Sequence, residues 1–370
     1  MFGRITYLPL LETYSQSLIP AVALHVRRSS SVTAHFAGSI LLDEGETAVS
    51  PHTLFDLASV TKLFTMTAFL RLVAEGAVQI DTPVVEVLPA FVGKRPIQPY
   101  EHPLQPGEWV TVSNETGPVD AGLVTFRHLL THTSGLPAWR PLFKLPDNER
   151  EATVLDSFFS YPTGTRVVYS DLGLILLGWA VEKVAKRPLP AAIRHFVTTP
   201  LGLNSIQFGP VPPEQAAPTE FCQWRNRRMQ GEVHDENAYS LGSVAGHAGL
   251  FGTAEDVAKL GQAWLDTLND GDFLPTALAE EAILLQAEDG QVRRGLGWAL
   301  WSPDQESASH LLSCSTFGHT GFTGTSLYID PERKLVVACL TNEVFNGRSE
   351  RKIGRFRREL HASVIAPAEG

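Results

Sequence analysis

The sequence has few cysteines, few methionines and no long apolar run. Its 370 residues include 3 cysteines. Cys222, Cys314 and Cys339 cannot all pair with one another, and they lack the close spacing of zinc ligands. We therefore expect reduced thiols, with neither a disulfide framework nor a metal site.

Segments typical of membrane spans and secretory signals are also missing. No stretch approaches the roughly 20 apolar residues that a membrane helix needs. Residues 1–13 contain a single Arg4, polar interruptions and Glu12 in their most apolar part, which is not the layout of a secretory signal. We expect a cytoplasmic protein, or a periplasmic one if the start of the chain has been processed.

Positive charge is in deficit. The sequence has 30 lysine and arginine residues against 40 aspartate and glutamate residues, which gives a net charge of -10. Nucleic acids and anionic membranes are usually bound by a positive surface, so neither is an expected partner. A small-molecule or short-peptide substrate is favoured instead, and the oligomeric state is left open.

Strand-like patterns lie near both ends of the chain, with helix-like patterns between them. Residues 22–27 alternate in the period of a strand, and residues 325–329 and 335–340 flank a turn-type sequence. Residues 63–75 have helical spacing and few polar positions, which predicts a helix buried on most sides. These patterns predict an α/β (α+β) fold in which an antiparallel sheet, flanked by N- and C-terminal helices, carries a helical insertion.

The same patterns suggest two parts. Residues 1–75 and 220–370 are expected to form the α/β domain, and residues 76–219 a mostly helical inserted domain. The ranges 93–122 and 209–218 are rich in proline and glycine, so we expect long loops there that help to shape a binding pocket.

The strongest local feature is a serine and a lysine three residues apart at the start of an apolar helix. This spacing places Ser59 and Lys62 on one helical face, and free N–H groups at a helix N-terminus favour developing negative charge. Ser349 and Lys352 share the spacing, but charged neighbours there predict a helix cap and a solvated face. A nucleophile activated by an amine is one interpretation of Ser59, and a buried hydrogen-bonded pair is the other.

Two further segments could contribute to a site. Tyr169 precedes a second apolar helix, and a lysine nearby could lower its phenol pKa from the usual value of about 10. The alternative is a core tyrosine followed by a helix-capping Asp171. The glycine-rich segment 318–324 contains His319 and could bring backbone N–H groups to an oxyanion, or it could be a simple turn with an exposed histidine.

In their order along the chain, these motifs resemble those of the serine β-lactamase and penicillin-binding protein superfamily, especially its class C and esterase-like branch. Four other segments resemble that branch: residues 54–59, 129–136, 245–251 and 295–298. The resemblance implies that Ser59 attacks a carbonyl while Lys62 and Tyr169 transfer its proton. It also implies an oxyanion hole made by the N–H groups of Ser59 and Phe322.

The resemblance further implies that His319, Thr320 and Gly321 face the substrate, and that no cofactor is needed. Two residues depart from the family pattern. Asp171 stands where asparagine or a similar residue is usual, which favours a cationic Lys62 that polarises Tyr169. His319 replaces a lysine and is a poorer partner for a carboxylate.

We therefore expect a serine hydrolase that cleaves an ester, amide or β-lactam bond through an acyl-enzyme on Ser59. A D-amino-acid peptidase or penicillin-binding carboxypeptidase is an alternative, and so is a binding or scaffolding member of the fold without turnover. Among the other polar residues, His132 and His247 are interpreted as structural loop histidines. The adjacent His234 and Asp235 are placed in a solvated loop or at the edge of the site, and residues 348–358 on a surface helix.

Overall fold

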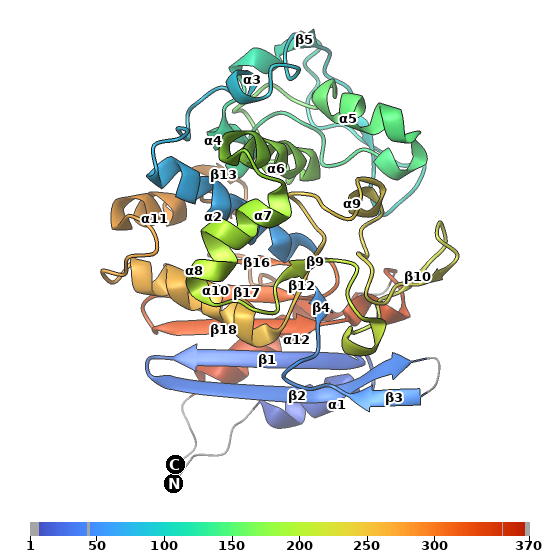
Figure 1. Ribbon diagram of the computed structural model, residues 1–370, viewed down its shortest axis with the longest axis vertical. Helices are drawn as coiled ribbons and strands as arrows, with labels where there is room; N and C mark the ends of the chain where they lie inside the picture. Colours follow the sequence, from blue (N-terminus) through green and yellow to red (C-terminus); the bar gives the residue numbers. More distant parts are fainter. Residues whose placement is uncertain (1–6, 43–44, 350, 367–370) are drawn as a thin grey trace.

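A computed structural model describes residues 7–42, 45–349 and 351–366. Arg4, on which part of the secretory-signal argument depends, lies outside the described residues. Within them, one large antiparallel sheet has 9 strands in the order β13-β14-β15-β16-β17-β18-β1-β2-β3 (Figure 1). The strands are β1 (Ala21–Arg28), β2 (Ser31–Leu42), β3 (Gly45–Ala48), β13 (Ala287–Asp289), β14 (Val292–Arg294), β15 (Ala299–Leu300), β16 (Phe317–Thr320), β17 (Ser326–Asp330) and β18 (Leu335–Thr341).

Both ends of the chain supply the centre of this sheet. β1 pairs with β18, with Val22 opposite Thr341, and with β2, with Val22 opposite Ala37. Successive side chains of a strand point to opposite faces. Ala21 and Ala23 accordingly join the core on one face, whereas Val22 and Leu24 join the core on the other. Both faces of β1 are therefore buried over residues 21–26, whereas the alternation alone predicts one buried face.

Helices cover both faces of the sheet. The terminal helices α1 (Leu8–Ser15) and α12 (Ile353–Ile365) lie on one face, where the rings of Tyr14 and Phe356 are 4.8 Å apart. On the other face α10 (Ala254–Thr267) packs against β1, β17 and β18. The Thr253 hydroxyl accepts a hydrogen bond from the N–H of Asp256, as its cap position predicts. The predicted fold class, an antiparallel sheet between terminal helices with a helical insertion, is confirmed.

The helix α2 (Thr61–Ala74) runs through the middle of the molecule and is buried along most of its length. It packs against α6 (Asp171–Ala185), the second apolar helix of the sequence. Figure 1 shows the helices of residues 84–155 above these two and those of residues 189–201 below them. The other α-helices are α3 (Val84–Val87), α4 (Phe126–Leu130), α5 (Asp147–Leu155), α7 (Leu189–Ile193), α8 (Thr199–Leu201), α9 (Glu236–Ser240) and α11 (Thr276–Ile283).

Short elements complete the fold. 3₁₀ turns occur at η1 (Ala58–Val60), η2 (Ala121–Leu123), η3 (Leu142–Lys144), η5 (Pro213–Gln215) and η6 (Glu343–Asn346), and a π turn at η4 (Arg194–Thr198). The short strands are β4 (Phe55–Asp56), β5 (Lys94–Arg95), β6 (Tyr100–Glu101), β7 (Trp109–Val110), β8 (Val119–Asp120), β9 (Gln207–Phe208), β10 (Phe221–Cys222), β11 (Arg227–Arg228) and β12 (Leu250–Gly252).

Three expectations about local structure are wrong. The range 93–122 is not a plain loop, because β5 pairs with β8 and β6 pairs with β7 within it. Ser349 does not cap a helix, because α12 begins only at Ile353. Residues 348–358 do not all lie on the surface, since the Arg357 side chain is buried. Among the described residues, no helix combines the length and apolar character needed to span a membrane.

Candidate active site

Ser59 lies in the 3₁₀ turn η1, directly before α2. The residue before it, Ala58, has a left-handed backbone with φ of 46°, which is unusual for a residue other than glycine. The buried Asp56 carboxylate holds this turn, since its Oδ1 accepts the N–H of Ala58 at 2.8 Å and its Oδ2 the N–H of His234 at 2.6 Å. Asp56, which the sequence reasoning did not single out, thus links the serine turn to the loop that carries His234.

Lys62 lies one helical turn after Ser59, as the spacing predicts. Its Nζ donates to Ser59 Oγ at 2.8 Å and to the carbonyl of His247 at 3.1 Å. The same Nζ is 2.8 Å from Asp171 Oδ1. Burial on its own would lower the pKa of Lys62, but Asp171 and Tyr169 outweigh it and leave the pKa above its ordinary value. Lys62 is therefore a cation, as the presence of Asp171 suggests.

The Tyr169 phenol lies within hydrogen-bonding reach of Ser59 and Lys62. Lys62 Nζ is 4.8 Å from the ring centroid. Burial raises the pKa of Tyr169, and this outweighs the lowering by the neighbouring lysine. The prediction that Lys62 pulls this pKa below its usual value is therefore wrong, and the phenol is neutral.

The ring of His132 packs against the ring of Tyr169. Its Nδ1 accepts the N–H of Ser170 at 3.1 Å, and its ring centroid is 4.7 Å from that of Tyr169. His132 is buried, which lowers its pKa well below the ordinary value, so the ring is neutral. The structural interpretation of His132 thus agrees with the geometry. The cap of α6 is Ser170, whose hydroxyl accepts the N–H of Gly173 at 3.4 Å, and not Asp171.

The segment after β16 comes close to the serine turn. Thr323 Oγ1 donates to the carbonyl of Asp56 at 2.8 Å, and Thr325 Oγ1 donates to the carbonyl of Leu57 at 2.9 Å. A side chain at Gly321 would place its Cβ 2.6 Å from the Leu57 oxygen, so glycine is required there. Phe322 then borders the same cavity as Ser59, where the resemblance places the oxyanion hole.

His319 faces the cavity in a neutral form. Its Nδ1 donates to the carbonyl of Thr320 at 2.8 Å, while its Nε2 has no hydrogen-bond partner among the described residues. Burial lowers the pKa of His319 to about 3, helped by the charges of Lys62 and Arg294. At this pKa His319 is neutral near neutral pH and offers no charge to a substrate anion, and its buried, unpartnered Nε2 is a hydrogen-bond acceptor.

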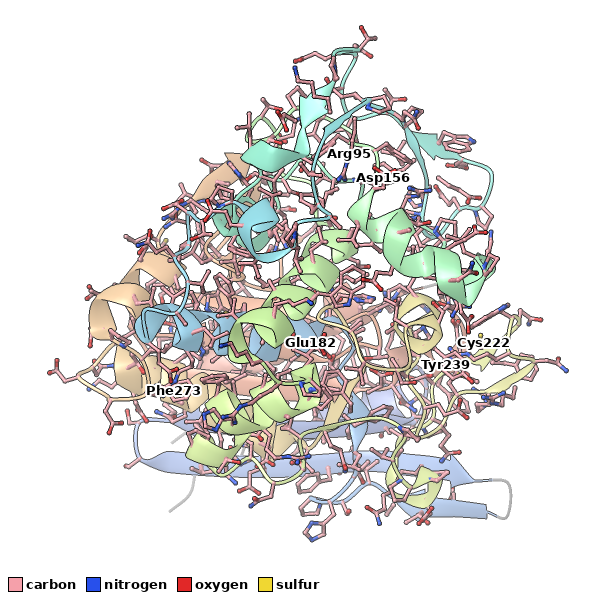
Figure 2. All side chains as sticks on the ribbon, turned by 45° about the horizontal axis from the view of Figure 1, so that its top comes forward. Arg95, Asp156, Glu182, Cys222, Tyr239 and Phe273 are labelled. Atoms are coloured by element: carbon pink, nitrogen blue, oxygen red, sulfur yellow. The ribbon has the colours of Figure 1, made fainter. Side chains whose placement is uncertain are left out.

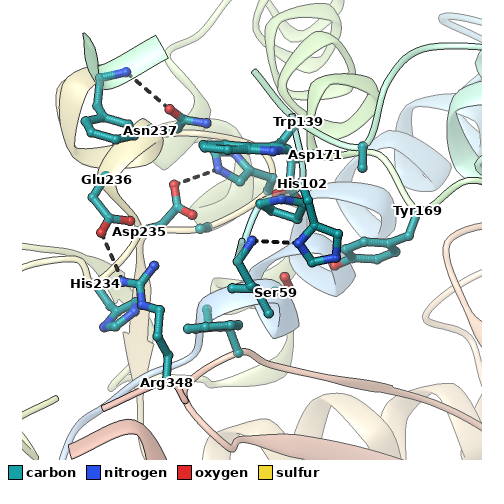
Figure 3. A pocket seen from close by; sticks show the side chains of 18 of the residues that line it. Ser59, His102, Trp139, Tyr169, Asp171, His234, Asp235, Glu236, Asn237 and Arg348 are labelled. Carbon is teal, nitrogen blue, oxygen red and sulfur yellow. Dashed lines mark hydrogen bonds and ion pairs between the residues drawn. The ribbon is translucent and has the colours of Figure 1, made fainter. Parts of the chain in front are cut away.

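Ser59 and Tyr169 lie between two cavities. The first has a volume of about 420 Å³ and mixes apolar walls with several acidic side chains. Figure 3 shows Trp139 and His102 on one side of Ser59, and Asp235, Glu236 and Arg348 on the other. Of the two ranges expected to shape the pocket, 93–122 does so through residues 101–104 and 106, whereas no residue of 209–218 lines this cavity.

The second cavity, of about 360 Å³, is strongly cationic. Besides Ser59 and His319, it is lined by Arg294, Arg351 and Arg357. Arg351 pairs with Glu343 at 2.9 Å, but Arg294 has no ion-pair partner among the described residues. The Nε–H groups of Arg294 and Arg357 donate no hydrogen bond to any described residue. These arginines were missed. One indication of Arg294 was available in the sequence, since it directly precedes the family-like segment 295–298.

His247 and Asp235 form part of the first cavity. His247 Nε2 lies 3.0 Å from Asp235 Oδ1, and the site-edge placement of Asp235 agrees with the geometry. Asp171, Asp235 and His247 also lie close enough together to hold a metal ion. A metal there would compete with the Lys62 ammonium for Asp171.

Two curated proteins are similar to this chain over most of its length. The N-acetylmuramyl-L-alanine amidase of Bacillus subtilis (strain 168) is 34% identical over 323 residues, which cover 79% of this chain and 68% of that protein. A putative D-alanyl-D-alanine carboxypeptidase of Escherichia coli (strain K12) is 29% identical over 348 residues, which cover 86% of this chain and 75% of that protein.

Solved structures share the fold. A class C beta lactamase from Rhodobacter sphaeroides has a TM-score of 0.73 at 19% identity and covers 98% of this chain and 99% of its own. EstCE1, a hydrolase with promiscuous acyltransferase activity, has a TM-score of 0.71 at 21% identity, with 95% and 97% covered. A family model described as Beta-lactamase matches residues 10–362, which confirms the resemblance seen in the sequence. The chain belongs to the Beta-lactamase family.

Proposed function

We propose that this protein is a serine amidase or peptidase that forms an acyl-enzyme on Ser59 and releases an amino acid bearing a free carboxylate. The observation that carries the proposal is the position of Ser59 between a partly apolar cavity and a cationic one. The first suits a bulky acyl group, and the second suits an anionic leaving group.

The protonation states suggest how the serine is activated. Ser59 Oγ attacks the amide carbon. The Lys62 ammonium, a cation, stabilises the negative charge that develops on Oγ as its proton leaves. The neutral Tyr169 accepts the serine proton while passing its own proton to the leaving nitrogen. The C–N bond breaks, the amine leaves, and a water molecule then hydrolyses the ester by the reverse proton path and restores the Ser59 hydroxyl.

The leaving group is argued from charge. Arg294 and Arg357 line the side of the cavity that also contains His319, and their buried Nε–H groups have no acceptor among the described residues. An α-carboxylate is a natural partner for such a guanidinium, and the neutral His319 Nε2 can accept a hydrogen bond from a substrate N–H. The names of the two relatives above both describe amide bonds to alanine, in agreement with this assignment.

Hydrolysis of matched substrates tests the proposal. We would compare acetyl-D-alanyl-D-alanine and N-acetylmuramyl-L-alanine with the corresponding C-terminal amides, which lack the carboxylate. A lost charge-assisted contact should lower kcat/KM about 10- to 100-fold for the amides. Arg294→Met should remove this preference, while the neighbouring Arg293→Met, whose side chain pairs with Glu288 at 3.3 Å, should keep it.

Three results would count against the proposal. Equal rates for acids and amides would remove the carboxylate assignment. Faster turnover of p-nitrophenyl esters or a chromogenic cephalosporin than of every amide would favour an esterase or β-lactamase. Turnover of none of these compounds, with ligand binding retained, would favour a binding member of the family.

A further inference from the structure

A third cavity adjoins the acyl side of the site. It has a volume of about 700 Å³, and Phe143, Glu236 and Arg348 line both it and the 420 Å³ cavity next to Ser59. The two hollows therefore share a wall and follow one another along the surface. An acyl group that extends away from Ser59 through the 420 Å³ cavity therefore reaches the third cavity.

An aromatic platform forms one side of this third cavity. Trp224, which follows strand β10, is 44% exposed. Its ring is held by edge contacts to Phe143, at 5.2 Å between centroids, and to Tyr239, at 5.8 Å. Figure 2 shows Cys222 and Tyr239 close together at this edge of the molecule. An exposed indole fixed by two ring contacts is a preorganised surface for a flat apolar face.

The charges around this platform cancel. Arg348 donates to Glu220 at 2.7 Å and to Glu236 at 3.0 Å. The remaining cation, Arg228, lies over the ring of Phe345, at 3.9 Å from its centroid. Two carboxylates thus face two guanidinium groups. Such a lining offers many hydrogen-bonding groups without a net charge, in contrast to the arginine-lined cavity on the other side of Ser59.

We propose that this third cavity is a subsite for a pyranose ring of a neutral saccharide joined to the acyl group. One face of a pyranose carries C–H groups that can lie on the Trp224 indole. Its rim carries hydroxyl groups that are both donors and acceptors, which match Glu236 and Arg348 and the amide side chains of Gln223 and Asn346 in the lining. This assignment rests on the proposed function, because it requires the acyl group to enter from the Ser59 side.

Binding to the full-length Ser59→Ala protein tests the subsite without turnover. Tri-N-acetylchitotriose is titrated while tryptophan fluorescence and heat are recorded. We expect saturable binding in the millimolar range or tighter, weakened about 10-fold in Ser59→Ala/Trp224→Ala and largely restored by Trp224→Phe. Trp109→Ala is the matched control, because Trp109 is 67% exposed and is not among the residues that line the three cavities.

The failures of the two proposals can be told apart. Absence of saturable binding up to about 20 mM, or equal binding by the Trp224→Ala variant, would overturn the subsite whatever the enzyme hydrolyses. Acetyl-D-alanyl-D-alanine that displaces the saccharide and quenches Trp224 would show a peptide subsite and would also overturn it. Loss of hydrolysis of all short acyl-alanines by the wild-type protein, with saccharide binding intact, would overturn the proposed function instead.

Discussion

The chemistry of this site depends most directly on the charge of the Lys62 side chain. It is buried, which disfavours a charge, yet it lies 2.8 Å from the Asp171 carboxylate. In a poorly solvated site the attraction between close opposite charges exceeds that in water, so the pair keeps the lysine protonated. Tyr169, and not Lys62, then transfers the serine proton.

Replacing Asp171 tests this protonation state. In Asp171→Asn the carboxylate that raises the pKa of Lys62 is gone, and the lowering by burial is then opposed only by Tyr169. We expect kcat/KM to fall about 100-fold near neutral pH, and the alkaline limb of its pH profile to move to lower pH as Lys62 loses its proton more readily. A rise in activity, with the acid limb moving down instead, would show that a neutral Lys62 is the base.

Asp56 provides a second titration at the residue scale. Burial raises the pKa of Asp56 to about 6, from an ordinary value of 3.8. Arg225 lowers this pKa and Asp235 raises it, while the N–H groups of Ala58 and His234 stabilise the anion. As the pH falls through about 6 the carboxylate takes up a proton, and one of the two N–H groups loses its acceptor.

We therefore predict an acid limb in kcat/KM with a midpoint near pH 6. Asp56→Asn should lower the plateau about 10-fold, because one N–H loses its partner, and should remove this limb. Asp120→Asn is the control, since Asp120 also accepts a backbone N–H, from Gly122 at 2.9 Å, but outside the site. An unchanged acid limb in Asp56→Asn would assign that ionisation to another group.

Single residues differ in how far the sequence predicts them. Ser59 and Lys62 are found because a helical spacing of three is local, and their neighbours are apolar. Arg294 is not found, because only the sheet brings β14 next to β15 and β16 and so to the cavity. The protonation state of His319 is also hidden, since it depends on burial and on Arg294, which lies elsewhere in the chain.

At the scale of elements, the site depends on one loop pressed against a helix. Residues 245–249 lie against α6, and a Cβ at Gly246 would be 2.0 Å from the carbonyl oxygen of Leu174. The next residue, His247, offers the carbonyl that accepts the hydrogen bond from Lys62. The glycine therefore sets the distance between this loop and α6, and through it the position of the lysine.

Gly246→Ala should disturb both stability and activity. Overpacking at this contact is expected to lower the free energy of unfolding by about 1–3 kcal/mol, measured by urea denaturation, and to lower kcat. Gly117→Ala is the matched control, because a Cβ at Gly117 meets no atom within 4 Å, and its effect should stay below about 0.5 kcal/mol. Equal stabilities of the two variants would contradict this packing.

The elements themselves were predicted where the pattern is long. β1, β18 and α2 stand out in the sequence as long, largely apolar segments, because both faces of the central strands and most of the helix are buried. Strands such as β5 and β6 have two residues each and no readable period. The charged residues near 348–358 follow a surface pattern, yet Arg357 is buried because its Nη2 donates to the carbonyl of Thr325 at 2.8 Å.

At the scale of the whole molecule, the three cysteines differ in burial, because both ends of the chain build the sheet and the helices that cover one of its faces. Cys339 on β18 faces the core beneath α1 and α12, and Cys222 is also buried, whereas Cys314 is exposed. Burial raises the pKa of Cys339 to about 12, which further suppresses its thiolate.

Thiol titration should therefore resolve two classes. In the native protein Cys314 should react rapidly with a disulfide reagent, while Cys222 and Cys339 react only after denaturation in guanidinium chloride. Cys314→Ser should abolish the rapid phase. Rapid reaction of Cys339 in the native state would show that the terminal helices do not cover this face of β18.

The central claim is that Ser59 becomes covalently acylated. Its most direct test is intact-protein mass spectrometry after incubation with a fluorophosphonate and, separately, with a slowly hydrolysed penicillin. One adduct per chain, located by peptide mapping on Ser59 and absent from Ser59→Ala, is the predicted result. An adduct of equal yield in Ser59→Ala, or no adduct with either reagent in the wild-type protein, would contradict it.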